Sequence, residues 1–279
     1  HNESAYHLSC SEDSLCPDSL FFGTSMNSES GHNESSEQER WYAAAFGSLY
    51  PILYAHRTVE TAAPEARFAC ASVALQREER ALDLCCGTGR HLVTLEETGA
   101  TLTGIDYSGE LLLMARDRLK PSTRLVRADM RKLPFNAAFD VVFSFFTSFG
   151  YFYEDADNSA TAREIARVLT TGGRFFMDYL NPLNLERTLK KETVRSVNEY
   201  TFVEKRWIDF ERRRVNKQVE VDKNNQHIET IRESVRLYTF AELSSLLHQA
   251  GLRVFTCHGD YLGAPYGPDS PRMIISGVK

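Results

Sequence analysis

The chain has 279 residues, of which 42% are hydrophobic and 25% are charged. This composition is typical of a globular enzyme with a full hydrophobic core, and we see no apolar stretch long enough to span a bilayer. Residues 1–40 hold eight acids and one base, so residues 41–279 carry +1 of the net charge of −6. Because a nearly neutral body does not attract nucleic acid or anionic lipid, we expect no nucleic-acid or membrane partner.

Residues 1–36 are polar and acidic and include ten serines. Such a segment buries too little apolar surface to order itself, so we predict a disordered and dispensable leader. The chain starts at His1 rather than Met, and whether this leader is native stays open. The six cysteines show no C-x-x-C spacing. They therefore predict no structural zinc site, and we expect reduced thiols in a cytoplasmic protein.

Ser36 and Glu39 have the spacing of a helix-capping box, and apolar residues then recur at helical spacing from Trp41 to Leu49. Pro51 can begin a second helix, since proline is tolerated in the first helical turn. We predict that this second helical region reaches Leu75, with a break near Pro64.

Short apolar runs alternate with helical patterns between residues 81 and 181. Strands are predicted at 81–86, 101–107, 123–129, 139–146 and 174–180. Helices are predicted at 90–98, 109–119 and 155–169, the last ended by Gly172 and Gly173. Alternation at this spacing indicates a parallel sheet that is covered by helices on both faces.

Residues 191–238 interrupt the alternation. Val215, Val219 and Val221 occupy one face of a strand, and a polar turn at 223–226 leads into a return strand. We predict an antiparallel excursion of about three strands. A helix at 240–250 capped by Thr239, a strand at 253–259, a loop at 261–271 and a last strand at 273–278 complete the chain.

The most informative motif runs from Asp83 through Gly87 and Gly89, where a buried strand ends in a glycine loop that opens a helix. Glycines let the backbone approach a ligand, and the helix start supplies free N–H groups. Position 92 is Leu where the dinucleotide fingerprint has a third glycine, which disfavours a nicotinamide cofactor. The Asp83 carboxylate repels phosphates but can hold an ammonium group.

Two further acids end the next strands. Asp106 stands 17 residues after Gly89, where a carboxylate can accept both ribose hydroxyls. Asp129 and Met130 follow the third strand, where the carboxylate can accept from an adenine amino group and the thioether can cover the ring. The implied ligand has adenine, ribose, no phosphate and an amino-acid end, which is S-adenosylmethionine.

With these motifs, residues 37–279 resemble the class I S-adenosylmethionine-dependent methyltransferases. The segments from Phe46 to Tyr50 and from Ser148 to Tyr151, with the insertion after the fifth strand, are similar to the nucleotide-sugar N,N-dimethyltransferases and glycine N-methyltransferase. The resemblance implies one α/β domain with a Rossmann-like seven-stranded, mainly parallel sheet. It also implies an N-terminal helical lid and an antiparallel β insertion, residues 191–238, that covers the substrate.

The resemblance further implies a cofactor site in which Arg57 binds the methionine carboxylate and Tyr50, with Tyr54, closes over the ligand. The implied cofactor-binding residues are Tyr50, Arg57, Asp83, Cys85, Gly87, Thr88, Gly89, Asp106, Tyr107, Asp129, Met130 and Phe145.

The predicted reaction is methyl transfer from S-adenosylmethionine to a nitrogen or oxygen of a small-molecule acceptor, without a metal. The acceptor itself and a homodimer stay open. No spacing selects a catalytic base, and the candidates are Tyr151, Asp178, Tyr179, His258 and Tyr261. The alternatives are a non-catalytic module that binds S-adenosylmethionine and, less favoured, an NAD(P)-dependent oxidoreductase.

Overall fold

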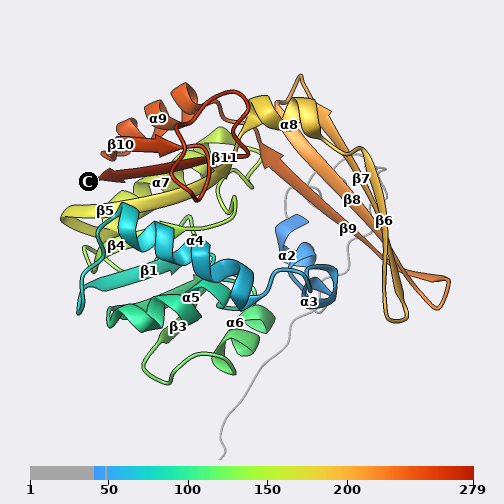
Figure 1. Ribbon diagram of the computed structural model, residues 1–279, viewed down its shortest axis with the longest axis horizontal. Helices are drawn as coiled ribbons and strands as arrows, with labels where there is room; N and C mark the ends of the chain where they lie inside the picture. Colours follow the sequence, from blue (N-terminus) through green and yellow to red (C-terminus); the bar gives the residue numbers. More distant parts are fainter. Residues whose placement is uncertain (1–40, 48) are drawn as a thin grey trace, which may run out of the picture.

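The structure, a computed structural model, describes residues 41–47 and 49–279 (Figure 1). The leader predicted at residues 1–36 and the capping box predicted at Ser36 lie outside these described residues. Within them, no helix combines the length and the apolar character needed to cross a membrane.

A seven-stranded sheet with the order β10-β11-β5-β4-β1-β2-β3 forms the centre of the molecule (Figure 1). Strands β1 to β5 pair in parallel, and β11 runs antiparallel to both of its neighbours. The predicted mainly parallel sheet is thus confirmed. The strands are β1 (Arg80–Leu84), β2 (Thr101–Asp106), β3 (Arg124–Arg127), β4 (Phe139–Ser144), β5 (Leu169–Leu180), β10 (Arg253–His258) and β11 (Arg272–Val278).

Helices cover both faces of this sheet, because successive side chains of its buried strands point to opposite faces. Leu82 of β1 belongs to one apolar cluster with residues of α7 and α9. Its neighbour Ala81 belongs to a second cluster with residues of α4, α5 and α6. These helices are α4 (Val59–Ser72), α5 (Arg90–Leu95, continued by a 3₁₀ turn, Glu96–Thr98), α6 (Gly109–Arg116), α7 (Asp155–Val168) and α9 (Phe240–Gln249).

The insertion after β5 forms a separate antiparallel sheet, with a short helix α8 (Pro182–Thr188) before it. The sheet has four strands rather than the three predicted: β6 (Glu192–Val197), β7 (Tyr200–Asp209), β8 (Arg214–Lys223) and β9 (Gln226–Arg236). The prediction missed β6 because this edge strand has no buried face, and its residues alternate only between exposed and half-buried.

Two short helices, α2 (Trp41–Ala45) and α3 (Tyr50–Leu53), lie between the central sheet and the insertion sheet (Figure 1). Trp41 and Leu53 share an apolar cluster with Phe202 of β7 and Ile231 of β9. The N-terminal helices therefore bury their apolar side chains against the insertion sheet, and these two parts of the chain share one hydrophobic cluster.

Two predicted boundaries are wrong. The N-terminal helices are interrupted at residues 54–58, where Thr58 caps α4 in a capping box, and α4 continues through Pro64. The glycine pair Gly172 and Gly173 does not end α7 but lies within β5, where pairing with β4 shifts register. A glycine pair suits such a bulge as well as a helix end, which is why the pattern alone misassigned it.

Candidate functional site

A cavity of about 680 Å³ opens where β1, β2, β3 and β4 end. In a mainly parallel sheet this edge, beside the strands at which the order reverses, is the usual place for a ligand. The N-terminal helices and strand β9 supply the opposite wall. The cavity is lined by ten of the twelve predicted cofactor-binding residues, namely Tyr50, Arg57, Cys85, Gly87, Thr88, Asp106, Tyr107, Asp129, Met130 and Phe145.

Gly89, which does not line the cavity, shapes the loop that does. It has a φ of 74° at the start of α5, a conformation that residues with a side chain rarely adopt. A Cβ at this position would lie 3.0 Å from Leu119 Cδ1. Gly89 therefore allows the tight turn from β1 into α5 and the close approach of this loop to the end of α6.

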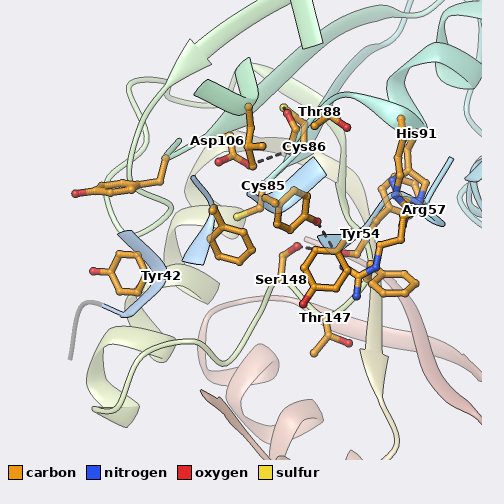
Figure 2. Close-up of a pocket in the computed structure, with 18 of the residues that line it drawn as sticks. Tyr42, Tyr54, Arg57, Cys85, Cys86, Thr88, His91, Asp106, Thr147 and Ser148 are labelled. Carbon is orange, nitrogen blue, oxygen red and sulfur yellow. Dashed lines mark hydrogen bonds between the residues drawn. The ribbon is translucent and has the colours of Figure 1, made fainter. Parts of the chain in front are cut away.

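The Asp106 carboxylate is held at the end of β2 by backbone donors. Its Oδ2 accepts a hydrogen bond of 2.8 Å from the Gly87 N–H, and its Oδ1 accepts one of 2.9 Å from the Ser108 N–H. Burial raises the pKa of Asp106, and these N–H groups act against that rise. The carboxylate is thus oriented in advance, and it faces the cavity (Figure 2).

The third strand brings Asp129 and Met130 to the same wall. Burial raises the pKa of Asp129, but hydrogen bonds from Arg131 outweigh it and lower the pKa overall. Arg131 Nη2 lies 2.7 Å from Asp129 Oδ2. The Met130 sulfur lies 3.7 Å from Cys85 Sγ, so a flat apolar surface adjoins the carboxylate. Asp129 and Met130 thus lie side by side on the cavity wall.

Asp83 lies behind the cavity rather than on its wall. It is 1% exposed, and neither carboxylate oxygen has a hydrogen-bond partner among the described residues. Burial raises the pKa of Asp83 to about 8, although Arg90 acts in the opposite direction. A buried carboxylate without a partner is costly, and a cationic group held near the glycine loop would relieve that cost.

We expect Asp83→Asn to stabilise the ligand-free protein, and more so at high pH. Because the folded-state pKa is raised above its unfolded value, the stability that Asp83 contributes is present below about pH 4 and is lost as the pH rises through about 8. The advantage of the variant should grow by on the order of 3 kcal/mol between about pH 5.5 and about pH 8. Urea unfolding at both pH values measures it, with Asp117→Asn as an exposed control. If Asp83→Asn raised the free energy of unfolding equally at both pH values, the raised pKa of Asp83 would be contradicted.

Arg57 lies across the cavity from Asp106 (Figure 2). Its guanidinium stacks over the Tyr54 ring at 3.7 Å and the Phe146 ring at 4.5 Å. Nη1 makes one long hydrogen bond of 3.4 Å to the Tyr50 hydroxyl, and the buried Nε has no partner among the described residues. The guanidinium is therefore fixed in direction but incompletely satisfied, as expected of a group that awaits an anionic ligand.

Aromatic rings from the N-terminal helices close this side of the cavity. The Trp41 and Tyr151 rings are 4.9 Å apart, and Phe46 stacks on Tyr151 at 5.8 Å. The Tyr50 and Tyr54 rings are 4.7 Å apart. Such a wall excludes water and offers ring faces to a cation.

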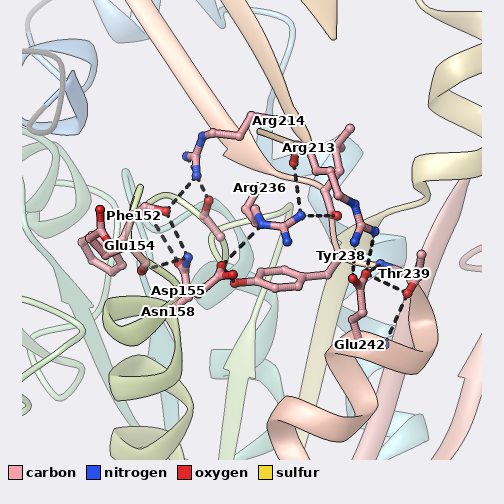
Figure 3. Close-up of polar contacts among 12 residues, drawn as sticks. Phe152, Glu154, Asp155, Asn158, Arg213, Arg214, Arg236, Tyr238, Thr239 and Glu242 are labelled. Carbon is pink, nitrogen blue, oxygen red and sulfur yellow. Dashed lines mark hydrogen bonds and ion pairs between the residues drawn. The ribbon is translucent and has the colours of Figure 1, made fainter. Parts of the chain in front are cut away.

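The loop after β4 owes its position to a buried arginine of the insertion (Figure 3). Arg214 donates to the carbonyl oxygens of Phe152 and Tyr151, at 2.8 and 3.0 Å, and to Ser234 Oγ at 2.7 Å. The Arg236 N–H adds a bond of 2.8 Å to the Gly150 carbonyl. The insertion therefore sets where Tyr151 stands in the cavity wall.

Of the five candidate bases, only Tyr151 lines the cavity. Asp178 is buried and accepts from the Phe146 N–H at 2.9 Å and from Arg272 Nε at 2.6 Å, so it supports the wall from behind. Tyr179, also buried, donates its hydroxyl hydrogen to the Arg236 carbonyl. His258 and Tyr261 pack against Phe68 of α4 and do not line the cavity.

Among the charged or titratable lining residues that sequence reasoning missed are His91, Glu233 and Arg272. His91 lies 2.7 Å from Glu65 and stacks on Phe145 at 4.0 Å. His91 could have been predicted from the sequence, because it lies in the first turn of the helix that follows the glycine loop. Glu233 and Arg272 reach the cavity only through the packing of distant segments, for which no local pattern exists.

The chain is similar to known methyltransferases. Residues 81–173 match a family model described as a methyltransferase domain. The chain is 30% identical over 207 residues to cypemycin N-terminal methyltransferase from Streptomyces, an alignment that covers 70% of this chain and 80% of the relative. It is 27% identical to glycine/sarcosine N-methyltransferase from Aphanothece halophytica, with coverage of 72% and 76%.

A solved structure shares the fold. CalS10, an amino pentose methyltransferase from Micromonospora echinaspora solved with S-adenosylmethionine bound, superposes with a TM-score of 0.61 at 22% identity. The alignment covers 83% of this chain and 97% of that one.

Proposed function

Because the chain belongs to the S-adenosylmethionine-dependent methyltransferase family, we propose that its cavity holds S-adenosylmethionine with the adenosyl group near Asp106 and the methionine group near Arg57. Asp106 would accept the ribose hydroxyls, and Asp129 with Met130 would take the adenine. Arg57 would bind the methionine carboxylate, and Asp83 would attract the ammonium group.

The observation that carries this proposal is that a buried carboxyl group and a buried guanidinium both keep polar atoms without a hydrogen-bond partner among the described residues. The Asp83 oxygens and the Arg57 Nε have no hydrogen-bond partner among the described residues. An α-amino acid group carries one ammonium and one carboxylate, and it would satisfy both charges. A dinucleotide would bring phosphates toward Asp83 instead, so the oxidoreductase alternative is not favoured.

The cofactor supplies a methyl group bonded to a positively charged sulfur, and transfer forms a bond to the acceptor as the sulfur–carbon bond breaks. The protein need only align the acceptor and exclude water. The aromatic wall would exclude water from the cavity. The loop that Arg214 holds lies next to this wall and would bound the space for the acceptor. We place the acceptor between this loop and strand β9, where Glu233 and Val235 line the cavity.

We further propose that the acceptor is a small molecule methylated at nitrogen, in keeping with the N-methyltransferases named among its relatives. Incubation with S-adenosylmethionine and a library of small amines and alcohols tests this proposal by the release of S-adenosylhomocysteine. We expect release above the acceptor-free rate with amines. If the protein binds S-adenosylhomocysteine but no library member accelerates its release, the non-catalytic alternative is supported instead.

A further inference from the structure

Four acids line the cavity, and they differ in what holds them. Asp106 and Asp129 lie on the sheet edge, where backbone N–H groups and Arg131 respectively engage them. Glu60 is exposed at the rim. Glu233 is half-buried and belongs to β9, so the insertion places one carboxylate on the wall opposite the glycine loop.

Among the described residues, Glu233 accepts a hydrogen bond through only one of its carboxylate oxygens, Oε1. Oε1 accepts a hydrogen bond from the Tyr54 hydroxyl and lies 2.8 Å from Lys217 Nζ, directly across from it on β8. No hydrogen bond to Oε2 is found among the described residues. Glu233 lines the cavity and Lys217 does not, so of this pair the residue in reach of a ligand is the acid.

The surroundings of this oxygen favour a cation. Tyr151 lines the same cavity, and Glu233 helps to raise the pKa of its hydroxyl, so the two residues are neighbours. Tyrosine ring faces attract cations, and the Tyr54 ring already carries Arg57 at 3.7 Å and Lys217 at 4.6 Å, which leaves the Tyr151 ring for a ligand. Arg57, a lining cation that Glu233 influences, stacks on Tyr54 and would be neutralised by the methionine carboxylate under the proposed function. A carboxylate oxygen without a partner beside aromatic rings is the chemistry that recognises a protonated amine.

Resting on the proposed function, we propose that Glu233 Oε2 binds the acceptor as a primary or secondary ammonium ion and takes up one of its protons, which frees the nitrogen lone pair to bond to the methyl carbon as the sulfur–carbon bond breaks. Tyr54 donates to Oε1 and Lys217 lies against it, so Oε2 is the oxygen left for the ligand. The insertion would then select amines over alcohols of equal shape, because a neutral hydroxyl gains much less from a carboxylate than an ammonium does.

The test is binding of n-butylammonium and of 1-butanol to the protein saturated with S-adenosylhomocysteine, followed by ligand-observed NMR. We expect the ammonium ion to bind at least about tenfold more tightly than the alcohol. Glu233→Gln should lose that preference, and Glu233→Asp should recover part of it. Glu229→Gln, on the same face of β9 but away from the cavity, is the matched control and should change affinity by less than about twofold.

The Lys217→Met variant tests whether Glu233 binds the ammonium ion or only supports the cavity wall through its ion pair with Lys217. Removal of the competing cation should leave ammonium binding equal or stronger, whereas a purely structural pair would make Lys217→Met as harmful as Glu233→Gln. The inference is overturned if Glu233→Gln binds n-butylammonium like the wild type, if both variants weaken binding alike, or if the wild type shows no saturable binding. S-adenosylhomocysteine that fails to bind the wild type would instead overturn the proposed function.

Discussion

The Asp106→Ala variant is expected to bind S-adenosylhomocysteine at least about tenfold more weakly than the wild type while remaining folded. The substitution removes an acceptor for two ribose hydroxyls, and each hydrogen bond to a charged group contributes roughly 1.5–3 kcal/mol. It also frees the Gly87 and Ser108 N–H groups that the carboxylate engages at 2.8 and 2.9 Å. Calorimetric titration measures the affinity, and circular dichroism checks the fold.

Asp106→Asn provides a graded comparison, because the amide keeps one acceptor oxygen and loses the charge. It should fall between the wild type and Asp106→Ala. The same variants should weaken 5′-methylthioadenosine, which has the ribose but lacks the amino-acid end. Unchanged affinity for either ligand in a folded Asp106→Ala protein would place the adenosyl group elsewhere.

Replacement of Arg57 by Met should have opposite effects on stability and on ligand binding. The ligand-free variant should be as stable as the wild type or more so, because it loses a buried charge whose Nε has no partner among the described residues. S-adenosylhomocysteine should bind at least about tenfold more weakly, since its carboxylate loses a charged donor. Arg57→Lys should recover only part of the affinity, because an ammonium cannot reproduce a bidentate contact.

The control for Arg57→Met is the ligand rather than another variant. Because 5′-methylthioadenosine has no carboxylate, its affinity should be nearly unchanged by Arg57→Met, although Asp106→Ala weakens it. Two titrations on two variants thus locate both ends of the ligand. Equal loss of both ligands in Arg57→Met would mean that this residue supports the cavity instead of binding the carboxylate.

The sheet, the glycine loop and the strand-terminal acids were predictable because their signals are local. Asp83 lies within a short apolar run, Gly87 and Gly89 follow at once, and Asp106 ends the next such run. Short-range periodicity settles each strand, and parallel pairing then brings the strand ends to one edge. The acid positions needed no knowledge of distant contacts.

The wall of the cavity formed by strand β9 was not predictable in the same way. Glu233 reaches it only because the insertion sheet packs on Trp41 and Leu53 of the N-terminal helices, through Phe202 and Ile231. Strand alternation puts Glu233 and Ile231 on one face but does not say what that face meets. Contacts between segments far apart in the chain decide this half of the site.

The central claim, that the cavity binds an adenosyl amino acid, is tested most directly by chemical unfolding of the wild-type protein with S-adenosylhomocysteine or with NAD. At a ligand concentration of about 100 times Kd, S-adenosylhomocysteine should add about 2.7 kcal/mol to the free energy of unfolding. NAD at the same concentration should add nothing measurable. Stabilisation by NAD with no response to S-adenosylhomocysteine would contradict the claim.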